Sequence, residues 1–193
     1  TQGVPLIENT QPYEDLPFQW SVHKWESIDK EIDEGKSFLK FTDQDIERQF
    51  VETLLEAVGE NGTIFAHNAQ EVEIRILKRL KIKDSCMDLA NKIDKIIDRM
   101  EDSLILSRMN FYSPKMNGKW KIKEIIKAIP NCPVSYDGQD NIGGGDEAQL
   151  AWFICTDIKT NDDKRKQKIK NLLDYCAKDT LALYYLIKFL MDK

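Results

Sequence analysis

The stretch TIFAHNAQEVEIRILKRL, residues 63–80, changes midway from the pattern of a strand to that of a helix. Thr63–Ala66 is a short apolar run typical of a buried strand. From about residue 70 to residue 80, Ile74, Leu77 and Leu80 recur at helical spacing and are expected to face inward. A buried strand that leads into a helix is a unit of open α/β sheets, whose sites form beyond the carboxyl ends of the strands. This passage therefore predicts an α/β fold with a candidate site at the sheet edge.

Two glutamates of this passage are alternative candidates for that site. Glu73 precedes Leu77 and Leu80 by four and seven residues, so it lies near the inward stripe of the helix. Glu71 falls outside that phase. Both carboxylates would also suit the positive end of the helix dipole without any functional role. We favour Glu73 and keep Glu71 as the alternative.

A second candidate pair, Tyr175 and Asp179, lies near the C-terminal end of the sequence. The two residues are four apart in a segment with helical apolar spacing, so they share one helix face. A carboxylate can hold a hard divalent cation, and a nearby phenol can orient or deprotonate a water molecule. This pairing is typical of metal-dependent phosphodiester hydrolysis, although a tyrosine packed on its own helix gives the same pattern.

The other segments extend the same architecture. Phe18–Trp25 alternates apolar and polar residues as a strand does, and Lys36–Phe41 is its expected hairpin partner. A helix is expected from Asp43 to about Val58. Further helices are expected over residues 85–99, 118–129, 146–156, 162–176 and 178–191. The order predicts a mixed α/β layer fold that forms one domain over residues 1–193.

Composition narrows the classes of function. The chain has 193 residues, a net charge of −5, 41% hydrophobic and 32% charged residues, which is typical of a soluble globular domain. No apolar run approaches the roughly 18 residues of a membrane span. The negative charge argues against binding nucleic acid by bulk electrostatics, but not against a nuclease, because metal ions can supply positive charge at the site. The four cysteines form no CxxC pair, so we expect reduced thiols and a cytoplasmic protein.

Three segments in order resemble the DEDD (DnaQ-like) 3′→5′ exonucleases of the ribonuclease H-like superfamily. They are His67-Asn68 followed by an acid, the stretch DSLILSR at residues 102–108, and Tyr175 with Asp179. From about residue 4 to residue 190 the chain also resembles an uncharacterised bacterial domain, domain of unknown function 2779, which often accompanies a RecB-like nuclease region. The phrases that carry this second resemblance are PYEDLPFQWSVH from residue 12, FYSP from 111, GGDEA from 144 and YCAKDT from 175.

The resemblance implies a ribonuclease H-like mixed sheet flanked by helices, and a site for two Mg²⁺ or Mn²⁺ ions that hydrolyses nucleic acid, either DNA or RNA. It makes Asp179 and Glu73 (alternatively Glu71) metal ligands and Tyr175 the residue that orients the attacking water.

The same resemblance also gives supporting roles to three further residues. Asn68 or His67 would steady the site from behind the ligands. Asp102 would brace the fold, because its family counterpart is not a ligand.

Two departures from the family pattern affect this prediction. The family's first motif, D-x-E on the opening strand, is expected a few residues before Thr1, so we expect a piece of a longer protein that lacks the first strand. In addition, Val72 stands where the family has an aspartate. We therefore expect this chain by itself to be a weak or inactive nuclease. The alternative is a non-catalytic module that binds nucleic acid or protein.

One basic segment is a candidate contact for nucleic acid. Lys119, Lys121 and Lys123 surround Trp120. Such a segment can follow the backbone of a single strand and stack a base. The same residues also fit a solvated helix face with Trp120 in the core.

Overall fold

The computed structural model describes residues 11–12, 14–27, 30–41, 45–136 and 142–192. Their elements follow in the order β1 (Gln19–Val22), β2 (Lys36–Leu39), α1 (Ile46–Val58), β3 (Ile64–Ala66), α2 (Glu73–Leu80), a 3₁₀ turn (Met87–Leu89), α3 (Ala90–Ile97), β4 (Met100–Asp102), α4 (Ser103–Asn110), a second 3₁₀ turn (Pro114–Met116), α5 (Ile122–Ala128), α6 (Gly145–Thr156) and α7 (Asp162–Met191).

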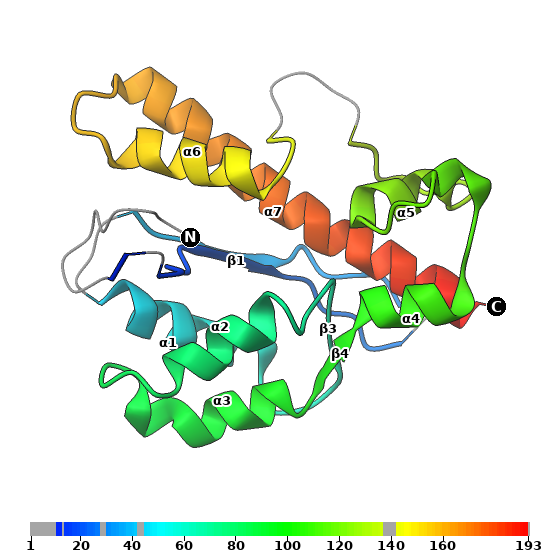
Figure 1. The fold of residues 1–193 in the computed structure, drawn as a ribbon, viewed down its shortest axis with the longest axis horizontal. Coiled ribbons are helices and arrows are strands. Elements are labelled where there is room, and N and C mark those ends of the chain that lie inside the picture. The colour runs from blue at the N-terminus through cyan, green and yellow to red at the C-terminus, as the bar shows by residue number, and fades with distance from the viewer. Residues whose placement is uncertain (1–10, 13, 28–29, 42–44, 137–141, 193) are drawn as a thin grey trace.

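The strands form a thin middle layer between two layers of helices (Figure 1). β1 pairs antiparallel with β2, and β3 pairs parallel with β4. Helices α1, α2 and α3 cover one side, and α7 crosses the other side in contact with β1, β2 and β3. Among the residues described, the strands make two separate pairs rather than one continuous sheet.

Aromatic packing fixes the hairpin on the first helical layer. Trp20 and Phe38 face each other across the ladder and stack at 6.1 Å between ring centroids. Phe50 of α1 meets Phe38 edge-on at 5.8 Å. Leu77 of α2 and Ile93 of α3 complete this buried cluster. The strand and hairpin predictions are confirmed here, with shorter strands than expected.

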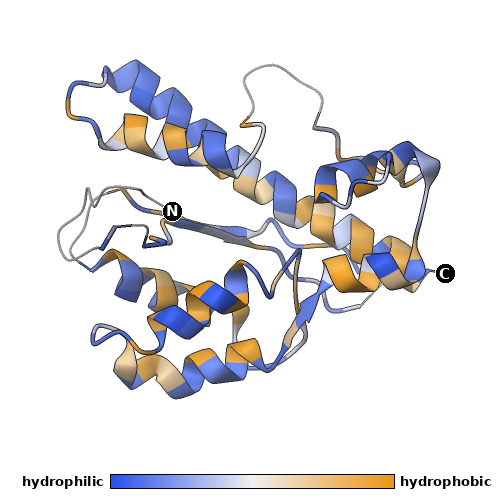
Figure 2. Cartoon of the chain, viewed as in Figure 1, coloured by the Kyte–Doolittle hydropathy of each residue, from blue (hydrophilic) through white to orange (hydrophobic). Residues whose placement is uncertain are grey.

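Helix α7 takes part in two further clusters. Its later turns bury Ala182 and Leu186 against Ile125 and Ile126 of α5. Its first half packs through Leu172 on α6. Figure 2 shows hydrophilic residues along the first turns of α7 and more hydrophobic residues toward its end. In the part of the chain that the structure describes, no helix combines the length and the apolarity that a membrane crossing requires.

The mixed α/β class is confirmed. The helices expected from Asp43 to about Val58, over about residues 70–80 and over residues 146–156 are present as α1, α2 and α6. Ile74, Leu77 and Leu80 are buried as the spacing predicted. The division into helices 162–176 and 178–191 is wrong, because one helix spans both segments. Neither glycine nor proline interrupts the junction, and residues such as Ala177 and Lys178 favour a continuous helix. Asp43 lies outside the described residues, and the ribonuclease H-like arrangement stays a prediction.

Candidate functional site

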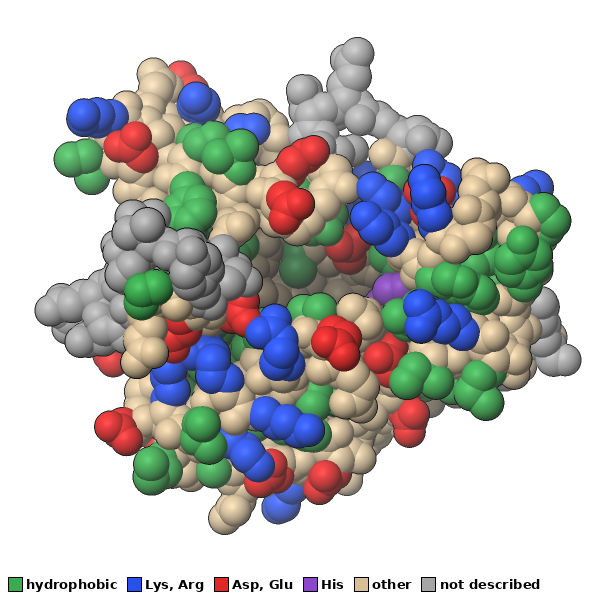
Figure 3. Space-filling model, viewed as in Figure 1, with side chains coloured by type: hydrophobic (Ala, Val, Ile, Leu, Met, Phe, Trp, Pro, Cys, Tyr) green, Lys and Arg blue, Asp and Glu red, His purple; other side chains and the backbone are tan. Residues whose placement is uncertain are grey.

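A groove with a volume of about 1540 Å³ lies between the two helical layers. Residues of β1 and β3 line its two flanks, α7 lines one side, and α1 and α2 line the other. Figure 3 shows the same face of the molecule hollowed between the α6–α7 layer and the α1–α3 layer. The space is larger than the 300–1,000 Å³ typical of small-molecule pockets.

The turn from β3 into α2 positions the first acid. β3 ends at Ala66, and Asn68 then adopts a left-handed conformation with φ of 65°, which asparagine tolerates better than most residues. The Asn68 carbonyl accepts hydrogen bonds from the backbone N–H groups of Glu71 (3.2 Å) and Val72 (3.3 Å). The turn therefore delays the helix until Glu73, whose side chain tilts toward the helix N-terminus and into the groove.

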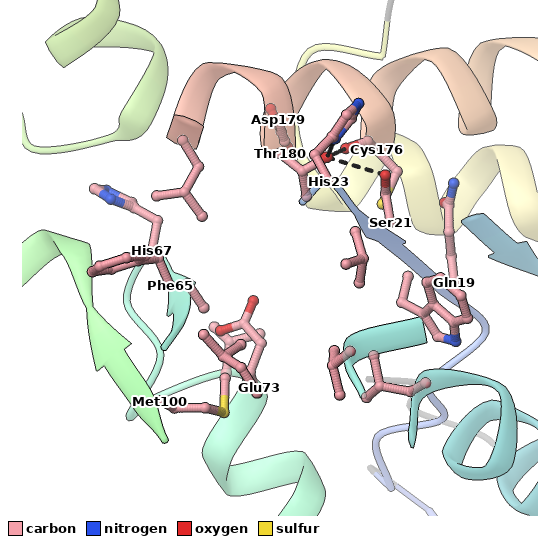
Figure 4. A pocket seen from close by; sticks show the side chains of 18 of the residues that line it. Gln19, Ser21, His23, Phe65, His67, Glu73, Met100, Cys176, Asp179 and Thr180 are labelled. Atoms are coloured by element: carbon pink, nitrogen blue, oxygen red, sulfur yellow. Dashed lines mark hydrogen bonds between the residues drawn. The ribbon is translucent and has the colours of Figure 1, made fainter. Parts of the chain in front are cut away.

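Glu73 is an acid in an unusual environment. Its Oε2 atom is buried and has no hydrogen-bond partner among the described residues. Burial, with a smaller contribution from the charge of Asp102, raises the pKa of Glu73 to about 7. Figure 4 shows the Glu73 carboxylate pointing into the open part of the groove. A buried polar atom without a partner is uncommon in native proteins and calls for an explanation.

Asp179 lines the groove from the opposite side, in the middle of α7 (Figure 4). Burial raises the pKa of its carboxyl group, while hydrogen bonds from Tyr136 and Tyr175 and the charge of Lys123 oppose that rise. The Tyr136 hydroxyl donates to Asp179 Oδ1 over 2.7 Å.

Burial and the neighbouring Asp179 carboxylate raise the pKa of the Tyr175 phenol. This phenol therefore stays protonated at neutral pH. It can orient a water molecule but not deprotonate one.

His67 is held at both ring nitrogens. Its Nε2 faces the Trp120 carbonyl at 2.8 Å and must donate to it, because a carbonyl only accepts. In the neutral ring Nδ1 then accepts from the Ser103 hydroxyl over 2.9 Å. Burial lowers the pKa of His67, which favours this neutral state. His67 thus borders the groove as a support that ties β3 to α4 and to the segment before α5.

Asp102 caps α4 and binds the turn that positions Glu73. Its carboxylate accepts from the backbone N–H groups of Leu104 (2.9 Å), Asn68 (3.0 Å) and Gln70 (3.4 Å). Both oxygens of Asp102 therefore accept hydrogen bonds from the backbone, so this carboxylate stabilises the turn and the start of α4.

The structure thus brings Glu73, Asp179, Tyr175 and His67 to one groove. It leaves Glu71 exposed to solvent. Asn68 and Asp102 of the predicted set support the β3–α2 turn, as the bonds above show.

The basic segment lies beside this groove. Lys119 and Lys121 are exposed, and Trp120 is half-buried against the α5–α7 cluster with the Arg108 guanidinium 6.0 Å from its ring centroid. Lys123 is the member of the segment whose charge acts on Asp179, and its Nζ donates to the Gly143 carbonyl over 3.0 Å.

Sequence reasoning missed three residues of the groove region. Tyr136 bonds to Asp179 although no motif includes it. Cys176 also lines the groove, and burial together with the charges of Asp179 and Glu73 raises the pKa of its thiol to about 12. Thr180 links α7 to β1 through Ser21 Oγ (3.0 Å) and His23 Nδ1 (2.7 Å). Of these, Cys176 and Thr180 adjoin the quoted motif, whereas Tyr136 gave no signal in the sequence.

The expected two-cation site needs more oxygen donors than the described residues bring together. No group of three or more histidine, cysteine, aspartate or glutamate side chains that could hold a metal ion occurs within the described ranges. Glu73 and Asp179 supply carboxylate oxygens from two sides of one groove. Oxygen is the ligand type that Mg²⁺ and Mn²⁺ prefer, but two carboxylates are too few ligands for two such ions. The described residues therefore form at most part of such a site.

Comparison with known proteins gives one family. The model of the family described as "Domain of unknown function (DUF2779)" matches residues 1–121, which is more than half of the chain. Neither the curated proteins nor the solved structures gave a match. The chain therefore belongs to the DUF2779 family of domains of unknown function.

Proposed function

We propose that this domain contributes to metal-dependent 3′→5′ hydrolysis of phosphodiester bonds in nucleic acid. The observation that carries the proposal is the buried, unpartnered Oε2 of Glu73, which faces the same groove as Asp179. An acid in this position costs folding free energy whenever it is charged, and a bound cation would offset that cost.

Each of the groove residues would have a separate role in the proposed reaction. Glu73 and Asp179 would hold divalent cations from opposite sides of the groove. Such cations, when bound, activate water and stabilise the charge that develops on the phosphate. Tyr175, with its protonated phenol, orients a water molecule next to Asp179. Tyr136 holds one oxygen of Asp179 and fixes the direction of the other.

Substrate access is supported by the charge beside Asp179. Lys123 lies close enough to Asp179 to lower the pKa of that carboxyl. A lysine in this position attracts a phosphate toward the acids, and exposed Lys119 and Lys121 extend the positive charge away from the groove. The terminal nucleotide of a single strand would reach the acids along this segment.

One observation favours the non-catalytic alternative, a module that binds nucleic acid or protein. The two acids by themselves fall short of a complete site, since no larger donor group exists among the described residues. Asp179 is also already engaged by two tyrosines. Under this alternative the domain binds its partner without hydrolysis.

The first experiment maps the cation. Mn²⁺ is titrated into the isotope-labelled chain at pH 8, and the paramagnetic broadening of backbone NMR signals is followed. We expect the earliest broadening around Glu73 and Asp179. The variants Glu73→Gln and Asp179→Asn should each weaken this broadening about tenfold, whereas the control Glu71→Gln should leave it unchanged. Broadening spread evenly over surface carboxylates would contradict the metal site.

The second experiment tests catalysis. Single-stranded DNA and RNA oligonucleotides with a 5′ fluorophore are incubated with Mn²⁺ and either the 193-residue chain or the same chain with a D-x-E strand added before Thr1. We expect stepwise shortening from the 3′ end, lost in Asp179→Asn, and little or none with the 193-residue chain. Nucleic-acid binding without shortening would establish the non-catalytic alternative instead.

A further inference from the structure

Helix α4 has the reverse of the polarity expected for a helix at the surface of a domain. Ser103 and Ser107 are fully buried, whereas Ile105 is 48% exposed and Met109 is 76% exposed. A surface helix normally turns its apolar residues inward and its polar residues outward. The outward face of α4 is therefore an apolar surface that the described residues leave open to solvent.

The two buried serines have hydrogen-bond partners inside the domain. The Ser107 hydroxyl donates to the Ser103 carbonyl over 2.6 Å, which is the carbonyl four residues earlier in the helix. The Ser103 hydroxyl bonds to Nδ1 of His67. A rotation of α4 that buried Ile105 and Met109 would break the bond between Ser103 and His67. The fold itself therefore keeps the apolar side chains of α4 outward.

The exposed apolar side chains lie close together on this part of the molecule. Met109 follows Ile105 by four residues, so the two side chains share one face of the helix. Tyr112, two residues after the end of α4, is 66% exposed. Figure 3 shows hydrophobic side chains next to Lys and Arg side chains where α4 and α5 form the surface. Single exposed apolar residues are common, but neighbouring ones mark sites of interaction.

The surroundings of this face are positively charged. Residues 103–123 contain one arginine, four lysines and no aspartate or glutamate, although the whole chain has a net charge of −5. Among the described residues, the four exposed members of this set form no ion pair; they are Arg108, Lys115, Lys119 and Lys121. The nearest acids along the chain are Glu101 before this segment and Glu124 after it. A partner of this face therefore needs negative charge.

Arg108 is the charged residue on α4 itself and directly precedes Met109. Its guanidinium lies 6.0 Å from the centroid of the Trp120 ring. An arginine that stacks on an aromatic ring keeps its N–H groups available, and a carboxylate can accept two parallel hydrogen bonds from them. Arg108 thus offers a carboxylate site next to the apolar face.

We propose that the outward face of α4 binds an acidic amphipathic helix of a partner protein. Apolar residues of that helix, spaced by three and four positions, cover Ile105 and Met109, and an acidic residue beside them binds Arg108. A second copy of this chain fits less well, because two α4 faces would bring like charges together. Nucleic acid fits the positive charge but leaves the apolar side chains uncovered.

This interaction is separate from the groove and does not rest on the proposed hydrolysis. Ile105, Arg108 and Met109 are not among the residues that line the groove. The binding of the helix requires no metal ion, so it is measured without Mn²⁺. Failure of this proposal therefore leaves the proposed nuclease function untouched, and failure of that function leaves this proposal untouched.

The first test titrates fluorescein-labelled peptides with the 193-residue chain and follows fluorescence anisotropy. The peptide SEELAELIAELEES forms an acidic helix with one apolar face, and we expect saturable binding of one peptide per chain. The peptide SEELLILAEAEEES has the same composition but spreads its apolar residues around the helix, so it should bind at least about tenfold more weakly. The peptide SKKLAKLIAKLKKS keeps the apolar face and reverses the charge, and it should also bind at least about tenfold more weakly.

The second test changes the protein at exposed positions, each with a matched control. Met109→Ser should weaken binding of the acidic peptide about tenfold, whereas Ile158→Ser, at an exposed isoleucine between α6 and α7, should leave it unchanged. Arg108→Glu should weaken it about tenfold relative to Lys166→Glu, which changes the net charge equally on α7. Circular dichroism checks that each variant is folded. If Arg108→Glu fails to fold, the comparison between the peptides decides the role of charge.

Several results would overturn the proposal. These are equal binding of the three peptides, no binding of any of them, or equal losses in Met109→Ser and Ile158→Ser. Dimerisation of the chain that Met109→Ser abolishes would assign the face to a second copy instead. Binding of a single-stranded oligonucleotide that Met109→Ser weakens, without binding of the acidic peptide, would assign it to nucleic acid.

Discussion

Glu73 should make the chain less stable as pH rises. In the folded state its pKa is about 7, against an ordinary value of 4.5 that applies to the unfolded chain. Between these two values the folded state binds the additional proton, so the free energy of unfolding falls with increasing pH by about 1.4 kcal/mol per pH unit. The contribution is fully lost above pH 7, and the total amounts to roughly 3 kcal/mol. That is a large share of the 5–15 kcal/mol typical of a domain.

The change that isolates this effect is Glu73→Gln, which keeps the shape and removes the titration. Urea unfolding followed by circular dichroism at pH 4.5, 6, 7 and 8 gives the free energy of unfolding of both forms. We expect the wild-type chain to lose roughly 3 kcal/mol relative to Glu73→Gln between pH 4.5 and pH 8. A constant cost of burying the amide cancels in this comparison, and so do all other titrating groups, including the two histidines.

A control variant and the addition of Mn²⁺ test whether the pH dependence comes from the buried carboxyl group of Glu73. Glu71→Gln alters an exposed side chain two residues away, and its stability should run parallel to that of the wild type. Mn²⁺ at pH 8 should restore part of the lost stability to the wild type only, because a ligand that binds the folded state stabilises it. Parallel pH profiles for the wild type and Glu73→Gln would refute the reasoning that burial keeps this acid protonated.

Three further results are expected. Asp102→Ala should lower the free energy of unfolding by about 2–4 kcal/mol in urea titrations, because it leaves three partly buried backbone N–H groups without this acceptor; a loss below 0.5 kcal/mol would show that Asp102 does not stabilise the fold. Tyr136→Phe should raise the pKa of Asp179, measured by carboxyl ¹³C NMR, because it removes a hydrogen bond that stabilises the charged form; an unchanged value would count against the bond. Mn²⁺ affinity, measured by calorimetry, should fall about tenfold per pH unit below about pH 7 as Glu73 takes up a proton, and stay flat above it; affinity independent of pH from 5.5 to 8 would exclude Glu73 as a ligand.

The sequence was sufficient to predict those elements that follow from a local pattern of residues. Alternation over residues 18–25 predicts β1, and the spacing of Ile74, Leu77 and Leu80 predicts the buried face of α2, since both follow from the backbone period of one element. The phase of that same helix separates Glu73 from Glu71. The predicted boundary within α7 is wrong although the local residues, with neither glycine nor proline at the junction, favour a continuous helix.

Only the tertiary structure decided what surrounds these residues. It places Glu73 and Asp179 on opposite sides of one groove, gives Asp179 a hydrogen bond from Tyr136, and leaves the Oε2 atom of Glu73 without a partner among the described residues. The partners of a buried group, and hence its pKa, depend on how α2 and α7 pack across the strands. Packing of this kind joins segments far apart in the chain, so no period along the sequence records it.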